Sequence, residues 1–133
     1  MESAMTIERG QSVTFRKTLT VAEQGFFTGI SGNLGAAHVD RVKARAMGLP
    51  DMAVFELAAG ALFSTALSRL AGPDYRIGAI SFSFHRAVTV GETLAATATS
   101  GGPEGKSLIC HLAGKIDGQT VVTGEAVLVP RES

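Results

Sequence analysis

Apolar residues are densest between residues 55 and 70, where their spacing predicts the longest helix of the chain. With their neighbours, they cover more than one face of that helix, as shown by Leu57, Ala58, Ala61, Leu62 and Leu70. A helix that is apolar nearly all round is normally buried, so we expect this helix to form the core. It would be about 24 Å long at 1.5 Å per residue, and Gly72-Pro73-Asp74 would end it.

Most of the remaining apolar residues alternate with polar ones, which is typical of strands. Strands are predicted at residues 13–19, 77–90, 93–99, 107–116 and 119–129. In the second of these, Ile80, Phe82 and Phe84 would face the core, while Ser81, Ser83 and His85 would face away from it. A loop is expected at residues 101–105, and Asp117-Gly118 predicts a tight hairpin because a type I′ turn needs positive φ.

Two short helices are predicted between the first strand and the long helix. Thr20 and Glu23 have the spacing of a capping box, in which each side chain satisfies a backbone N–H, so a helix should cover residues 21–28. A second short helix should follow Asp40 and end near Gly48. The glycine-rich segment 31–35 between them is typical of a loop.

This order of elements predicts an α+β fold in a single domain covering residues 1–133. There is no alternation of strand, helix and strand, so a parallel sheet is not favoured. We expect a curled antiparallel sheet around the long buried helix, with the last four strands in a meander. An open sheet leaves edge strands with unpaired backbone groups, and a homodimer that pairs these edges would satisfy those groups.

The composition argues against several classes of function. Lys plus Arg number 12 and Asp plus Glu number 12, so no net field would attract nucleic acid or an anionic membrane. Cys110 is the single cysteine, and no Cys/His pair has zinc-finger spacing. Residues 1–11 contain no apolar run typical of a signal peptide, and polar residues interrupt the longest apolar stretch. We therefore expect a cytoplasmic protein that neither binds nucleic acid nor spans a membrane.

The segment 31–40 reads S-G-N-L-G-A-A-H-V-D and follows Phe26-Phe27. It resembles the S-G-D-x-N-P-x-H-x-D signature of the MaoC-like, R-specific enoyl-CoA hydratases, which have the hot-dog fold. The resemblance continues through residues 62–64, 84–88, 90–92 and 122–126. It implies a long helix wrapped by an antiparallel sheet, in agreement with the fold predicted above, and an active-site tunnel at a subunit interface.

The resemblance also implies a reaction. Family members add water reversibly to a trans-2-enoyl-CoA, and backbone N–H groups at the start of the central helix polarise the thioester carbonyl. His38 would be the acid/base group and Asn33 would position the water. The substrate would be an acyl-CoA or acyl-carrier thioester, and no cofactor is implied beyond the coenzyme A of the substrate. Substrate contacts are implied for Ser31, Gly32, Phe55, Leu57 and Arg86.

Several positions depart from the signature. Asn33 replaces the aspartate, Gly35-Ala36 replaces Asn-Pro, and Phe55-Glu56 replaces the His-Gly pair that opens the central helix. An amide can orient a water molecule but cannot accept its proton, and general acid/base help is worth about 10²–10⁴-fold in rate.

Two alternatives to the hydratase therefore stay open. Other hot-dog branches use a carboxylate on the central helix, so Glu56 with His38 could form a thioesterase site. A domain without its base could also be a non-catalytic acyl-CoA-binding or partner subunit. The positions of the Glu56 and His38 side chains discriminate between these hypotheses.

Overall fold

The computed structural model describes residues 7–131. The first six residues of the segment in which no signal peptide is expected lie outside that range. The elements, in chain order, are β1 (Ser12–Thr18), α1 (Val21–Ser31), α2 (Ala36–Val39), α3 (Arg41–Ala46), α4 (Glu56–Ala71), β2 (Tyr75–Phe84), β3 (Thr93–Glu104), β4 (Ser107–Ile116) and β5 (Gln119–Pro130). None of the helices within the described range combines the length and apolar character needed to span a bilayer.

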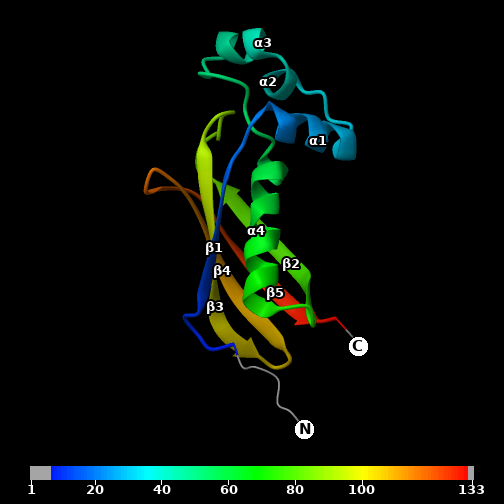
Figure 1. Ribbon diagram of the computed structural model, residues 1–133, viewed down its shortest axis with the longest axis vertical. Coiled ribbons are helices and arrows are strands. Elements are labelled where there is room, and N and C mark those ends of the chain that lie inside the picture. The colour runs from blue at the N-terminus through cyan, green and yellow to red at the C-terminus, as the bar shows by residue number, and fades with distance from the viewer. Residues whose placement is uncertain (1–6, 132–133) are drawn as a thin grey trace.

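The strands form one antiparallel sheet in the order β1-β3-β4-β5-β2 (Figure 1). Only β3, β4 and β5 form a meander, because β2 pairs with β5 rather than β3. The predicted meander of four strands is therefore wrong. The chain leaves β2 at one edge and crosses to β3, which lies next to β1 near the opposite edge.

Two predicted strand boundaries are also wrong. β2 ends at Phe84 rather than near residue 90, because residues 88–90 bond to the segment that precedes α4: Val54 N–H donates to the carbonyl of Val88 at 2.7 Å. The predicted loop at residues 101–105 is largely strand, since β3 continues to Glu104. A bulge between Ser100 and Gly102 absorbs the glycines. The predicted hairpin is confirmed, with positive φ at both Asp117 and Gly118.

The helix α4 lies along one face of the sheet, and their contact is the core (Figure 1). Its buried face includes Leu62, Phe63 and Leu67, which pack against small residues of β3 such as Ala96 and Ala98. The expectation that this helix is almost wholly buried is wrong for the single chain. The sheet covers only one side of α4, and Leu57 on the other side is 64% exposed.

Position in the sheet also explains the exposure of β2. Phe82 and Phe84 are half-buried and pack against the core, as predicted, whereas Ile80 is 39% exposed. The strand has a neighbour only on its β5 side, so its backbone edge is open in the single chain. Cys110 is buried in the core, and this burial raises the pKa of its thiol to about 11.

The helices α1, α2 and α3 form a separate layer beyond the start of α4 (Figure 1). The predicted capping box begins α1: Thr20 N–H donates to Glu23 Oε1 at 2.6 Å, and Ala22 N–H donates to Thr20 Oγ1 at 3.1 Å. The helix runs three residues beyond the predicted end at Thr28, to Ser31. The predicted second helix is confirmed as α3, and the one-turn helix α2 was not predicted.

Candidate active site

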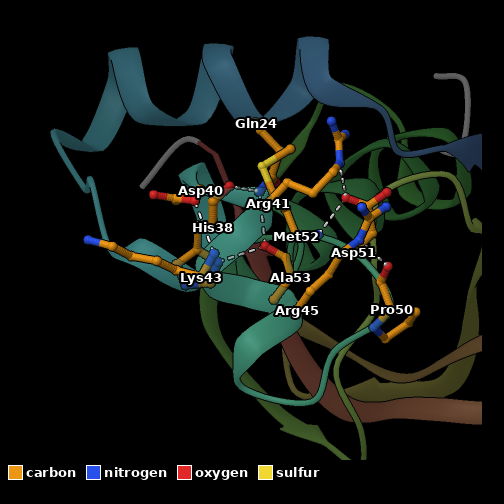
Figure 2. Close-up of polar contacts among 10 residues, drawn as sticks. All are labelled: Gln24, His38, Asp40, Arg41, Lys43, Arg45, Pro50, Asp51, Met52 and Ala53. Carbon is orange, nitrogen blue, oxygen red and sulfur yellow. Dashed lines mark hydrogen bonds and ion pairs between the residues drawn. The ribbon is translucent and has the colours of Figure 1, made fainter.

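His38 lies in the one-turn helix α2 (Figure 2), and its ring has two contacts that fix it. Its Nδ1 lies 2.7 Å from the carbonyl oxygen of Ala53. The ring stacks on Phe55, with centroids 4.2 Å apart and planes 21° apart. A carbonyl oxygen can only accept, so Nδ1 donates and Nε2 is the nitrogen left for chemistry. His38 is half-buried and held in this way, so Nε2 is the ring nitrogen without a protein partner among the described residues.

The loop before His38 is shaped by local hydrogen bonds. Gly32 ends α1 with φ of 75°, a left-handed conformation that suits glycine. Ser31 Oγ donates to the carbonyl of Phe27 at 2.8 Å and accepts from Asn33 N–H at 3.1 Å. Ser31 and Gly32 therefore set the path of this loop, and their implied contacts with substrate stay a prediction.

Asn33 is exposed and turns back onto its own loop. Its Oδ1 accepts from Gly35 N–H at 2.8 Å, which forms an Asx turn. A Cβ at Gly35 would lie 3.1 Å from Asn33 Oδ1 and 3.3 Å from His38 Cδ2. The side chains of Asn33 and His38 therefore lie against the same point of Gly35. The structure brings together the two residues that the signature pairs.

The start of α4 offers backbone donors. Its N-cap, Phe55, provides no side-chain cap, and its carbonyl accepts from the amides of Ala58 and Ala59. Within residues 7–131, the amides of Glu56 and Leu57 donate to no other group. Unpaired first-turn amides and the helix dipole together favour negative charge at this end.

The Glu56 side chain is exposed in the first turn of α4. Among the described residues it forms no hydrogen bond or ion pair with His38. The geometry within one chain therefore does not support a Glu56–His38 pair. Leu57 is also exposed at this end, whereas Phe55 is buried beneath His38.

Arg86 is engaged within its own loop. Its guanidinium makes a bidentate ion pair with the Glu92 carboxylate, and both N–O distances are 3.0 Å. Glu92 Oε1 also accepts from the backbone N–H of Thr89 at 2.8 Å. The bond to Arg86 lowers the pKa of the Glu92 carboxyl and raises that of Arg86. A contact of Arg86 with a phosphate would compete with this pair, and that contact stays a prediction.

Two shallow pockets flank α1. One, of about 260 Å³, lies beside His38 and is bordered by Thr28, Val39 and Met52. The other, of about 160 Å³, lies between α1 and α4 and is bordered by apolar residues that include Phe26 and Ile30. No group of His, Cys, Asp or Glu residues that could hold a metal ion occurs in the part of the chain that is described.

Sequence reasoning missed Gln24, which lies on α1 and is buried. Its side-chain amide bonds to the backbone of His38, Ala53 and Phe55, and Figure 2 shows the first two of these contacts. A glutamine on a short, partly polar helix is normally a surface residue, so no local pattern distinguishes it.

Comparison with known proteins identifies the family. The sequence model described as the MaoC like domain matches residues 4–121. The (R)-specific enoyl-CoA hydratase of Rhodospirillum rubrum is 32% identical over an alignment of 128 residues that covers 93% of this chain and 89% of that protein. The chain therefore belongs to the MaoC-like domain family.

Solved structures agree on the fold. The (R)-hydratase from A. caviae involved in PHA biosynthesis has a TM-score of 0.89 and 25% identity, covering 96% of this chain and 99% of that one. The R-hydratase PhaJ1 from Pseudomonas aeruginosa has a TM-score of 0.87 and 22% identity, covering 96% and 88%. The fold is the hot-dog fold, as the α+β prediction and the resemblance indicated.

Proposed function

We propose that this chain catalyses the reversible addition of water to a trans-2-enoyl thioester, with His38 as the acid/base group. The observation that carries the proposal is the 2.7 Å bond from His38 Nδ1 to the Ala53 carbonyl. It leaves Nε2 of a neutral imidazole free to accept a proton. Family membership and the 32% identity to an (R)-specific enoyl-CoA hydratase support the choice of reaction.

In the proposed reaction, His38 Nε2 takes a proton from water as the hydroxide oxygen bonds to C3 of the enoyl group. Electrons shift toward the thioester oxygen, and the unpaired amides of Glu56 and Leu57 at the start of α4 stabilise the negative charge. The imidazolium then returns the proton to C2. One water molecule is added, and His38 ends in its starting protonation state.

Asn33 would hold the water through its amide. Its Oδ1 already accepts from Gly35 N–H, so the Nδ2 donors are the groups left to contact the water oxygen. An amide cannot take the proton, so His38 must perform both transfers. We therefore expect hydration slower by about 10²–10⁴-fold than with a carboxylate base, which is the usual worth of such a group.

The test is a two-channel assay of the full chain. Crotonyl-CoA and saturated acyl-CoAs are supplied separately, and loss of the enoyl absorbance and release of free thiol are followed independently. We expect loss of enoyl absorbance without thiol release, and His38→Ala should abolish it. Thiol release from saturated acyl-CoAs, dependent on His38, would replace the hydratase with the thioesterase.

A non-catalytic role is the second candidate, and Asn33 in place of the signature aspartate favours it. In that case the chain would bind an acyl thioester, while the chemistry would belong to a partner subunit. Binding of crotonyl-CoA measured by calorimetry, together with no turnover in either channel, is the result that would select this role.

We also propose that the chain works as a homodimer. The edge strand β2 exposes Ile77 and Ile80, and the outer face of α4 exposes Leu57 and Ala61. A second copy could cover both surfaces and enclose the pockets that lie open in one chain. Sedimentation at micromolar concentration should give twice the monomer mass, and a monomer alone would contradict the proposal.

A further inference from the structure

Gln24 is 4% exposed, although it lies on α1, a helix whose other polar side chains reach solvent. Its amide makes three hydrogen bonds, all to backbone groups of other segments. Nε2 donates to the carbonyl of His38 at 2.8 Å and to that of Ala53 at 2.9 Å, and Oε1 accepts from Phe55 N–H at 3.3 Å. The side chain therefore joins α1 to α2 and to the start of α4, and Figure 2 shows its bonds to His38 and Ala53.

Each of these backbone groups bears on the His38 ring. Ala53 supplies the carbonyl that fixes Nδ1, and Phe55 supplies the aromatic ring on which the imidazole stacks. The third group is the carbonyl of His38 itself. The Gln24 amide thus holds the carbonyl that accepts from the His38 ring, the backbone of the residue on which that ring stacks, and the backbone of His38.

The chemistry of these bonds requires an amide. Two of the backbone partners are carbonyls, which need donors, and the third is an N–H, which needs an acceptor. A glutamate would supply only acceptors when ionised, and a methionine would supply neither. Either replacement leaves the His38 carbonyl without its donor and leaves the Ala53 carbonyl with the His38 ring alone. A folded chain avoids an unpaired buried carbonyl by moving it toward water or another donor.

We propose that Gln24 is a positioning residue that fixes the Nδ1-protonated form of His38 and leaves Nε2 as the reactive nitrogen. The inference rests on the proposed role of His38 in hydration. The positioning itself is a property of the ring, and it is measurable without turnover. Gln24 touches no reacting atom in this account and acts only through Ala53, Phe55 and the backbone of His38.

The test is ¹⁵N NMR of the imidazole in full-length protein at alkaline pH, where the ring is neutral. In the wild type we expect the proton on Nδ1. Gln24→Met has a similar shape without polar atoms, and Gln24→Glu keeps the acceptor but loses both donors. In both variants we expect a mixture of tautomers, because the Ala53 carbonyl is no longer held.

Thr20→Ala is the matched control. It weakens the start of α1 by removing the acceptor for Ala22 N–H, but makes no contact with His38. We expect the wild-type tautomer in this variant. A comparable change of tautomer in Thr20→Ala would mean that any loosening of α1 disturbs the ring, and the specific role of Gln24 would be refuted.

Kinetics form the second arm. In Gln24→Met, kcat for crotonyl-CoA should fall by about 10²-fold, the usual effect of misplacing a catalytic group by about 1 Å, with KM little changed. If the wild type shows no hydration, the proposed function fails, and the tautomer measurement still decides the role of Gln24. A wild-type ring protonated on Nε2, or a Gln24→Met ring unchanged from wild type, would overturn the inference. The wild-type measurement applies even if neither variant folds.

Discussion

Asn33→Asp tests whether a base is the main group that this site lacks. The loop should accept the change because its hydrogen bonds do not use the amide nitrogen. Asn33 Oδ1 accepts from Gly35 N–H, and Asn33 N–H donates to Ser31 Oγ. One carboxylate oxygen can keep the first bond, and the other is then free to take a proton from water.

The size of the expected gain follows from two opposing effects. A general base is worth about 10²–10⁴-fold in rate. A misplacement of about 1 Å can remove about 10²-fold, and Gly35-Ala36 gives this loop more freedom than the Asn-Pro of the signature. We therefore expect kcat/KM for crotonyl-CoA to rise by at least about tenfold, without reaching the full worth of a well-placed base.

The assay is the initial rate of loss of enoyl absorbance in wild type, Asn33→Asp and Asn33→Ser. Serine keeps an oxygen that can accept from Gly35 N–H but provides no base, so this control should show no gain. Adding His38→Ala to Asn33→Asp should remove the gain. If the folded Asn33→Asp variant hydrates no faster than wild type, the reasoning about the missing base is wrong.

Four further substitutions test the stability of the fold. Leu62 is 6% exposed in the core, so Leu62→Ala should lower the free energy of unfolding by about 2–5 kcal/mol in urea, and a loss below about 0.5 kcal/mol would mean the core is misplaced. Gly124→Ala should cost about 3 kcal/mol or more, since its Cβ would overlap the backbone carbonyl oxygen of Ser81 in β2. Gly29→Ala, with nothing within 4 Å of the added Cβ, should instead stabilise by about 0.5–1 kcal/mol, and the reverse order would refute the packing argument. The Thr20 side chain lowers the pKa of Glu23 from 4.5 to about 2, so Glu23 stabilises the fold above pH 4.5 and loses this effect as pH falls toward 2. Glu23→Gln should therefore lower the melting temperature at neutral pH, with the difference from wild type closing between about pH 4.5 and 2.

The elements with strong local signals were predictable from the sequence. The capping box at Thr20 locates the start of α1, and the continuous apolar pattern locates α4. The Asp117-Gly118 dipeptide, both of whose residues adopt positive φ, locates the last hairpin. Each of these signals depends on residues that are close together in the chain. The alternating pattern of β2 was equally clear, but such a pattern does not indicate which strand lies beside it.

The parts that could not be predicted depend on contacts between distant segments. The edge position of β2 leaves Ile80 exposed where alternation alone would place it in the core. Gln24 is buried where its amide bonds to the backbone of His38, Ala53 and Phe55, which are distant from it in the chain. The signature indicated His38 and Asn33 as candidates, but the partners that orient the His38 ring come from tertiary structure.

The strand order also has a consequence for how the chain folds. The hairpins β3–β4 and β4–β5 join strands that are neighbours in the sequence. In contrast, β1 pairs with β3, which lies far along the chain, as the pair Ser12 and Thr99 shows. Closing the long loops that precede these pairings costs entropy before any contact stabilises the pair. The meander of β3, β4 and β5 should therefore form first, and the outer strands β1 and β2 should join late. The same strands should then exchange their amide hydrogens soonest in the native protein. The segment that holds His38 is tethered between β1 and α4, so the candidate site would be completed only in the last stage of folding.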